Sequence, residues 1–305
     1  MITSVDNPRV KDALRLRKSR ERRRLGLFIA EGPREVERAI AAGLVVREIF
    51  HAPELLPGWS PPADRVRGDD KADRARGDDK AAFVTEVRVD QHPDDSGRRR
   101  SSELAGPRGL SEVAVIVTEV RAQEVSARVL AKLSYRADPE GVIAVVEAPR
   151  REFPRDATLL LVAVGIEKPG NLGAMARTAD AAGADALLVA DAATDPWNPN
   201  AIRASTGAVF TLPVVAATRT EVAQLSQQKI AAVVGAPTPH TAADYTCPTA
   251  ILIGAEDSGL DREWQALAQE TVAIPMRGRT ADSLNASAAA AVLLFEAVRQ
   301  RDARG

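Results

Sequence analysis

The segment Asn171-Leu-Gly-Ala-Met-Ala-Arg177 decides the fold, because it lies where a strand gives way to a helix. Residues 158–164 form an apolar run of strand length, and residues 171–182 read as a helix. The alternation continues along the chain: we predict strands at 186–190, 230–235, 250–254 and 271–274 and a last helix at 286–299. Such alternation indicates an α/β fold with a mostly parallel sheet and helices on both faces.

Two further segments also follow predicted strands in this half of the chain. The first is Ile251-Leu-Ile-Gly-Ala-Glu-Asp-Ser-Gly259, and the second runs from Ile274-Pro-Met to Ser283-Leu-Asn285. Ligand sites of parallel sheets gather at the carboxyl ends of the strands. We therefore expect the chemistry of this protein at the carboxyl edge of the predicted sheet.

A glycine-rich turn at Gly165, Gly170 and Gly173 raises the alternative of a nucleotide-binding loop. Dinucleotide-binding folds require the spacing G-x-G-x-x-G, and Walker-type loops require Gly-Lys followed by Ser or Thr. The chain has neither pattern. A nucleotide-dependent oxidoreductase is therefore disfavoured.

The three segments, together with Asn198-Pro-Asn-Ala-Ile-Arg-Ala-Ser-Thr-Gly-Ala208, resemble the signature motifs of the SpoU/TrmH family. Members of that family are RNA ribose 2′-O-methyltransferases that use S-adenosyl-L-methionine, have a trefoil-knotted α/β domain and pair as homodimers. The resemblance covers about residues 159–300. It implies an enzyme with that cofactor; the alternative, a catalytically silent RNA-binding relative, is disfavoured because no key motif residue is lost.

The resemblance also assigns the site. The implied catalytic residues are Asn171, Arg177, Ser283 and Asn285, and the implied cofactor-binding residues are Gly254, Glu256, Ile274 and Leu284. Family accounts cast Arg177 as the base, but a guanidinium with a pKa above about 12 is a poor proton acceptor. We expect Arg177 to clamp the target phosphate and stabilise the oxyanion, although the sequence leaves both roles open.

Several of these residues also have purely structural interpretations. On a helix, Asn171 and Arg177 would be offset by about 120° around the axis, so Asn171 would cap the helix or hold Arg177 through intervening groups. Ser283 and Asn285 could cap the last helix. The alanine run that begins at Ala286 suits close packing in a knotted domain, but alanine also simply favours helix.

The N-terminal segment from Arg9 to Arg24 is strongly basic, with nine Arg and Lys residues against Asp12 and Glu21. A helix through it would present a narrow apolar stripe and direct the guanidinium groups elsewhere. We predict phosphate contacts to RNA from Arg17, Arg20, Arg22 and Arg23. The alternative is a solvated surface helix.

A second α/β unit precedes the motifs. Strands are predicted at 27–31 and 45–50 with a helix at 35–40 between them, and the unit resumes with a strand at 113–117, a helix at 124–133 and a strand at 141–146. The segment Phe28-Ile-Ala-Glu-Gly-Pro-Arg-Glu-Val36 resembles the opening of the SpoU-type substrate-binding domain. We expect this RNA-binding domain at 1–150 and the knotted methyltransferase domain at 151–305.

Between these halves, residues 57–111 form an insertion rich in Asp, Arg, Gly, Pro and Ser. It contains a short tandem duplication, Arg67-Gly-Asp-Asp-Lys-Ala and Arg76-Gly-Asp-Asp-Lys-Ala81. With little apolar content it is expected to be a flexible loop, with one strand at 81–85. An RNA-grasping arm using arginines 98–100 is the alternative.

Composition and charge bear on the partners, the metal content and the cellular location of the protein. The chain has 305 residues and a net charge of −1, so affinity for RNA depends on where the basic residues lie. A single cysteine and three histidines form no zinc-ligand pattern, and we expect no metal. The polar N-terminus and the lack of a long apolar run predict a cytoplasmic protein that does not enter a membrane. The resemblance favours ribosomal RNA as substrate, with transfer RNA as the alternative.

Overall fold

The structure is a computed structural model that describes residues 1–60, 80–88, 113–154, 156–191 and 194–304. Most of the predicted insertion, including arginines 98–100 and nearly all of the tandem duplication, lies outside the described residues. None of the helices in the described ranges has the length and apolar character needed to cross a membrane.

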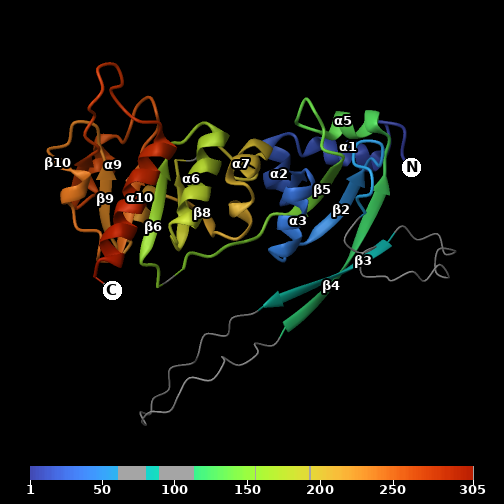
Figure 1. Cartoon of the computed structure of the whole chain (residues 1–305), viewed down its shortest axis with the longest axis horizontal. Coiled ribbons are helices and arrows are strands. Elements are labelled where there is room, and N and C mark those ends of the chain that lie inside the picture. The colour runs from blue at the N-terminus through green and yellow to red at the C-terminus, as the bar shows by residue number, and fades with distance from the viewer. Residues whose placement is uncertain (61–79, 89–112, 155, 192–193, 305) are drawn as a thin grey trace, which may run out of the picture.

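The N-terminal half forms a five-stranded sheet in the order β1-β5-β2-β4-β3 (Figure 1). Its strands are β1 (Leu27–Glu31), β2 (Val46–His51), β3 (Lys80–Arg88), β4 (Val113–Glu124) and β5 (Val142–Glu147). Neighbours pair antiparallel, except that β2 and β4 pair in parallel. The sheet is accompanied by α1 (Pro8–Arg15), α2 (Ser19–Leu25), α3 (Pro33–Ala41) and α5 (Ala127–Leu133).

Among the boundaries in this half that differ from the prediction, two have a clear structural cause. Strand β4 continues to Glu124, because Arg121 to Glu124 pair with β2, and α5 consequently begins three residues late, where the Ser126 hydroxyl accepts from the Val129 amide at 3.4 Å. The basic segment is not one helix. Helix α1 ends at Arg15 and α2 starts at Ser19, since Leu16 between them is buried in the core beneath.

The C-terminal half forms a seven-stranded sheet in the order β10-β12-β9-β11-β6-β7-β8, and every pairing is parallel. Its strands are β6 (Leu159–Val164), β7 (Ala186–Ala190), β8 (Val214–Ala217), β9 (Gln228–Ala232), β10 (Thr238–Pro239), β11 (Thr249–Ile253) and β12 (Glu270–Ala273). The sequence analysis missed β8 and β10, which are short and lie at the two edges of the sheet.

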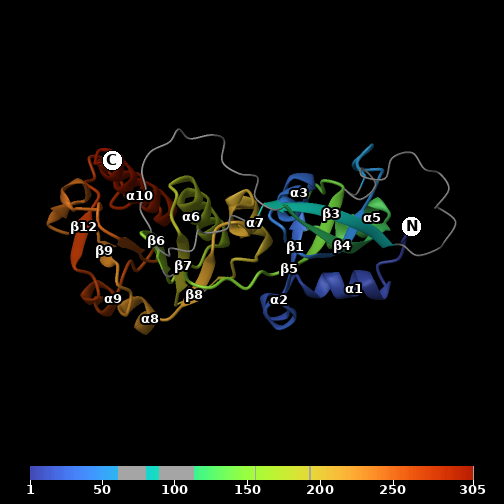
Figure 2. The same cartoon turned by 90° about the horizontal axis from the view of Figure 1, so that it is seen from below.

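Helices cover both faces of this sheet. They are α6 (Pro169–Ala181), α7 (Pro199–Ser205), α8 (Arg219–Ala223), α9 (Arg262–Ala266) and α10 (Ala286–Asp302), with 3-10 turns η2 (Ala208–Phe210) and η3 (His240–Ala242). Figure 2 shows α6 and α10 on one face and α8 and α9 on the other. Separate hydrophobic clusters fill the two faces. The prediction of an α/β fold with a mostly parallel sheet and helices on both faces is confirmed.

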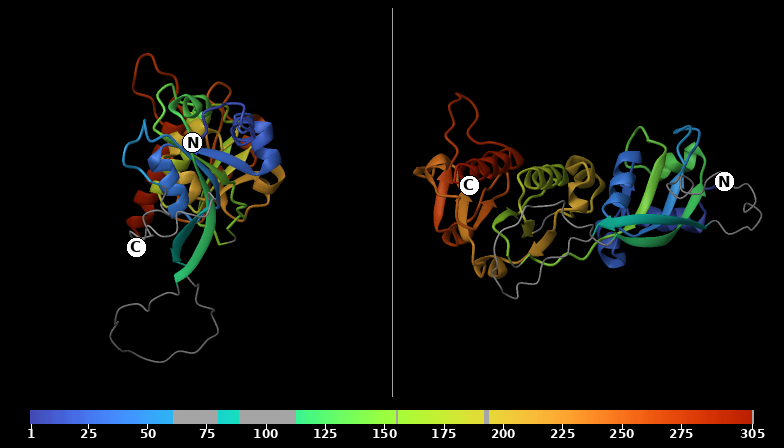
Figure 3. Two further views of the ribbon diagram at one scale, coloured as in Figure 1. Left: turned by 90° about the vertical axis from the view of Figure 1, so that its right-hand side faces the viewer. Right: turned by 60° about the horizontal axis from the view of Figure 1, so that its bottom comes forward.

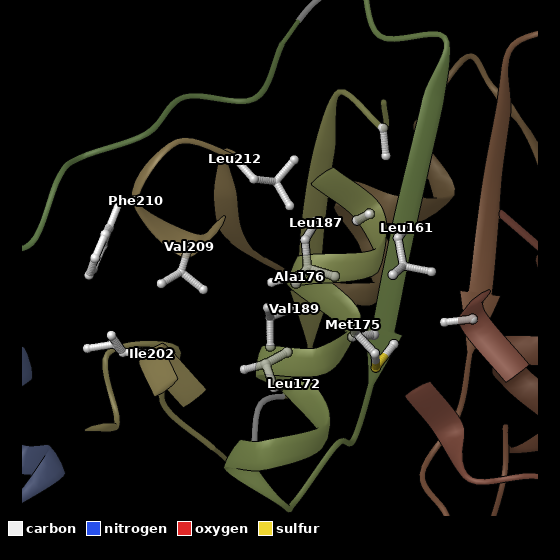
Figure 4. Close-up of a cluster of buried hydrophobic side chains, with 14 of the residues drawn as sticks. Leu161, Leu172, Met175, Ala176, Leu187, Val189, Ile202, Val209, Phe210 and Leu212 are labelled. Atoms are coloured by element: carbon white, nitrogen blue, oxygen red, sulfur yellow. The ribbon is translucent and has the colours of Figure 1, made fainter. Parts of the chain in front are cut away.

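The two sheets lie side by side along the long axis of the molecule (Figure 3). One hydrophobic cluster runs from the N-terminal sheet into the face under α6, and Figure 4 shows its part around α6, α7 and η2. Phe28 of β1 stacks on Trp197 and Phe210, with ring centroids 4.8 Å and 5.7 Å apart. The two halves are therefore joined by packed aromatic rings as well as by the chain itself.

Candidate active site

The first motif forms the turn from β6 into α6. Strand β6 ends at Val164, Gly165 adopts φ +64°, and α6 begins at Pro169 with Lys168 as its N-cap. Asn171 therefore lies inside the first turn and is not the N-cap, so the capping interpretation is wrong. Gly173, further along α6, faces the backbone of Ala201 so closely that a β-carbon would collide with it. This glycine allows α6 and α7 to pack in direct backbone contact.

The second motif is a tight loop at the end of β11. The Gly259 amide donates to the Ala255 carbonyl at 2.9 Å, which folds the loop back on itself. A β-carbon on Gly254 would collide with the backbone of Gly259 and Leu260. Glycine is therefore required here, and Glu256 is placed beside the start of α6.

The third motif leads into α10. Asn285 is the N-cap of that helix: its Oδ1 accepts from the Ser287 amide at 3.0 Å and from the Ser287 hydroxyl at 2.6 Å. Ser283 does not cap the helix and is exposed. Of Ser283 and Asn285, only Asn285 has the expected capping role.

The three motifs meet at the carboxylate of Glu256. Its Oε1 accepts from the side-chain amide of Asn171 and, at 2.7 Å, from the side-chain amide of Asn285. Asn285 also donates to Asn171 Oδ1 at 3.3 Å. Lys168 Nζ lies 2.7 Å from Glu256 Oε2. Residues more than 80 positions apart are joined in one polar cluster.

Lys168 was not among the predicted residues, although it directly precedes the first motif. Its side chain is 71% exposed, and the Glu256 carboxylate is 18% exposed. The hydrogen bond to Glu256 raises the pKa of Lys168. The sequence shows a lysine at the start of the helix, but it does not show which loop packs against that helix. The pairing of Lys168 with Glu256 could therefore not be predicted.

Arg177 lies apart from this cluster. It is exposed on α6 and, within the described part of the chain, has no hydrogen-bond or ion-pair partner. Arg177 therefore forms no hydrogen bond with Ser283 or Asn285 in the described structure. Its guanidinium is free to bind an anion.

The expected cofactor wall is partly apolar. Ile274 follows β12 and packs half-buried against the core, while Leu284 is 37% exposed just before α10. Together with the loop at Gly254, these residues place apolar side chains and closely approachable backbone at the carboxyl edge of the sheet. Such a surface suits an adenosine-containing cofactor.

The four predicted RNA-binding arginines have different environments. Arg22 is buried: its Nε lies 2.8 Å from Asp195 Oδ2, and its Nη1 donates to the carbonyls of Leu16 and Arg17. The prediction that Arg22 contacts phosphate is wrong, because its guanidinium is enclosed by protein acceptors. Arg17 donates to the Lys132 carbonyl at 3.1 Å and lies over the Tyr135 ring.

Arg20 and Arg23 remain available on the surface of α2. Arg23 donates to the Ser19 hydroxyl at 3.1 Å, and Arg20 has no hydrogen-bond or ion-pair partner among the described residues. Both side chains are exposed. Of the four arginines predicted to contact RNA, Arg22 is thus buried, and fewer exposed guanidinium groups than expected are available to RNA.

Two known protein families match separate parts of the chain. Residues 158–295 match the SpoU rRNA Methylase family, and residues 7–86 match the MRM3-like substrate binding domain. The 23S rRNA (uridine(2479)-2′-O)-methyltransferase of Streptomyces viridochromogenes is 40% identical over 179 residues, which cover 53% of this chain and 61% of that protein.

Solved structures cover nearly the whole chain. A crystal structure of an RNA 2′-O ribose methyltransferase is 36% identical with a TM-score of 0.70, and covers 98% of each chain. The SpoU methyltransferase AviRb from Streptomyces viridochromogenes, solved in complex with AdoMet, is 26% identical with a TM-score of 0.72 and covers 97% of this chain and 98% of its own. The chain belongs to the SpoU rRNA methylase family, which confirms the resemblance inferred from its motifs.

Proposed function

We propose that this protein transfers a methyl group from S-adenosyl-L-methionine to the 2′-hydroxyl of a ribose in ribosomal RNA. The observation that carries the proposal is the junction of all three family motifs at the Glu256 carboxylate, with the exposed Arg177 further along the same helix as Asn171 and without a hydrogen-bond or ion-pair partner among the described residues. Its relatives and structural neighbours are named as RNA 2′-O-methyltransferases. The domain at 1–150 would bind the RNA, and the domain at 151–305 would perform the transfer.

Methyl transfer to a hydroxyl requires in-line positioning, loss of the hydroxyl proton and stabilisation of the developing alkoxide. When bound, the cofactor supplies an electrophilic methyl group. Gly254, Glu256, Ile274 and Leu284 would hold it at the carboxyl edge of the sheet. Arg177 would clamp the target phosphate and stabilise the oxyanion, with Ser283 beside it.

Glu256 is a positioning residue in this proposal. Its carboxylate already accepts from two amides and pairs with Lys168, so it holds the helix start, the β11 loop and the α10 N-cap in one arrangement. Asn171 and Asn285 act through it. Because α10 begins inside this cluster, the geometry of the active site depends on the position of the segment that leads into α10.

Three further features belong to the proposal. The chain would form a trefoil knot that fixes the position of the segment before α10. The hydrogen bond from Asn285 to Asn171 of the first motif supports this placement. The protein would act in the cytoplasm. It would pair as a homodimer, supported by Phe295 of α10, which is 49% exposed, whereas Leu293 of the same helix is buried in the core of its own chain.

The test is methyl transfer from labelled S-adenosylmethionine to ribosomal RNA, followed by mapping of the modified nucleotide. Arg177→Ala is expected to lower turnover by about two to three orders of magnitude, the effect of losing one oxyanion donor. Cofactor affinity, measured by calorimetry, should not change. RNA binding without any transfer by the wild type would favour the catalytically silent relative, and unchanged turnover in the variant would remove Arg177 from the mechanism.

A further inference from the structure

A cavity of about 620 Å³ lies in the N-terminal half, far along the chain from the motifs. Its lining residues come from helices α1 and α2 on one side and from strands β1, β2, β4 and β5 on the other. Its volume is within the roughly 300–1,000 Å³ typical of small-ligand pockets. None of the residues carrying the proposed chemistry lines it.

Five arginines from four separate elements converge on this cavity: Arg9, Arg15, Arg24, Arg47 and Arg121. On a chain whose net charge is −1, this is a local concentration of positive charge. Guanidinium groups bind phosphates bidentately and stack on bases. The cavity therefore has the chemistry of an anion site that also accepts a planar group.

The ion pairs that involve these arginines are weak competitors for such a ligand. Arg15 pairs with Asp12 at 2.9 Å, Arg24 with Glu21 at 2.8 Å and Arg47 with Glu147, and all three arginine side chains are more than half exposed. Exposed ion pairs of this kind are weak, because water screens both charges. Arg121 has no hydrogen-bond or ion-pair partner within the described ranges.

The rest of the lining is suited to a base rather than to phosphate alone. Leu16, Leu25 and Leu27 provide apolar surface. Among them lies Glu48, whose Oε1 is buried without a hydrogen-bond partner in the described structure; the nearest cation, Arg9 Nη1, is 3.8 Å away. Burial raises the pKa of Glu48, while Arg9 and Arg121 oppose that rise. An unfilled acceptor of this kind calls for an N–H donor.

We propose that this cavity binds one unpaired nucleotide of the RNA substrate, with its phosphate on the arginines and its base edge on Glu48. The inference rests on the proposed function, which makes RNA the substrate. Single-stranded RNA is read through splayed bases that stack on planar side chains and hydrogen-bond along their Watson–Crick edges. Guanine fits best, because its edge presents two adjacent N–H donors to a carboxylate.

The test uses the full-length protein with saturating S-adenosylmethionine, so that the cofactor site is occupied, and titrates it with guanosine monophosphate, uridine monophosphate, guanosine and inorganic phosphate. Guanosine monophosphate is expected to bind at least about tenfold more tightly than any of the other three, since one bidentate base contact discriminates by roughly that factor or more. Equal affinity for guanosine monophosphate and inorganic phosphate would overturn the proposal.

Variants locate the site. Arg121→Gln, and independently Leu25→Glu, which places a negative charge in the cavity, should each weaken nucleotide binding at least fivefold. Glu48→Gln should reduce the preference for guanosine over uridine monophosphate. The matched control is Arg128→Gln, because Arg128 is exposed on α5 of the same half and does not line the cavity. Similar affinities for Arg121→Gln, Leu25→Glu and Arg128→Gln would refute the assignment.

Methyl transfer is measured separately on the same samples. Absence of transfer by a wild type that still binds guanosine monophosphate would overturn the proposed function and leave the cavity assigned. Methyl transfer to RNA without nucleotide binding in the cavity would overturn the cavity assignment and leave the proposed function standing.

Discussion

The buried ion pair between Arg22 and Asp195 should be the polar contact on which the joining of the two halves depends most. The Arg22 side chain is 2% exposed and that of Asp195 is 5% exposed. Asp195 also accepts from the Trp197 amide at 2.9 Å and from the Ser19 hydroxyl at 3.2 Å. Replacing Asp195 with alanine would therefore leave a buried guanidinium without its counter-charge and two donors without their acceptor.

Breaking a buried pair by removing one partner costs about 3–5 kcal/mol. We expect Asp195→Ala to lower the free energy of unfolding by this amount, because Arg22 would retain only uncharged acceptors among the described residues: the carbonyls of Leu16 and Arg17 and, at 3.5 Å, the Tyr135 hydroxyl. The matched control is Asp12→Ala, which removes a pair whose side chains are 62% and 69% exposed. That control should change stability by at most about 1 kcal/mol.

Urea unfolding followed by far-ultraviolet circular dichroism and by tryptophan fluorescence provides the assay, since Trp197 lies at the junction. A double-mutant cycle with Arg22→Met separates the pair from the other hydrogen bonds of Asp195. If Asp195→Ala lost no more stability than Asp12→Ala, the argument that this contact holds the two halves together would be refuted.

The remaining predictions concern RNA, acid and assembly. Changing Arg20 and Arg23 to Gln should make the slope of log K against log salt concentration for RNA binding less steep by at most about 1.4, at about 0.7 per phosphate on single strands. An unchanged slope would indicate that α2 is only a solvated basic helix. The hydrogen bond from Arg299 lowers the pKa of Glu296 from 4.5 to about 2, despite its burial, so Glu296 stabilises the fold above pH 4.5 and this contribution is lost as the pH falls towards 2. Glu296→Gln should therefore flatten the acid limb of stability between those pH values, and a parallel limb in the variant would contradict this. Light scattering at micromolar concentration should give a dimer mass for the wild type and a monomer mass for Phe295→Asp, whereas a wild-type monomer would contradict the homodimer.

Local sequence determined much of this protein. The apolar runs at 158–164 and 250–254 and the glycine-rich turn before the helix are short-range patterns, and the structure has strands β6 and β11 and helix α6 there. The motif residues were identifiable through their resemblance to the SpoU/TrmH motifs, and they lie at strand ends, where this fold class places ligand sites. Residues 81–85 also lie in a strand, β3, as predicted.

Tertiary structure decided which charged residues are exposed and which are paired. Arg22 has the same local sequence context as Arg20 and Arg23, and only the approach of Asp195, 173 residues later, buries it. The meeting of Asn171 and Asn285 at Glu256 spans 114 residues, and the arginine cavity draws on two helices and four strands. Helix and strand periodicity reports which face of an element is apolar, but the partner of that face is set by packing between segments distant in the chain.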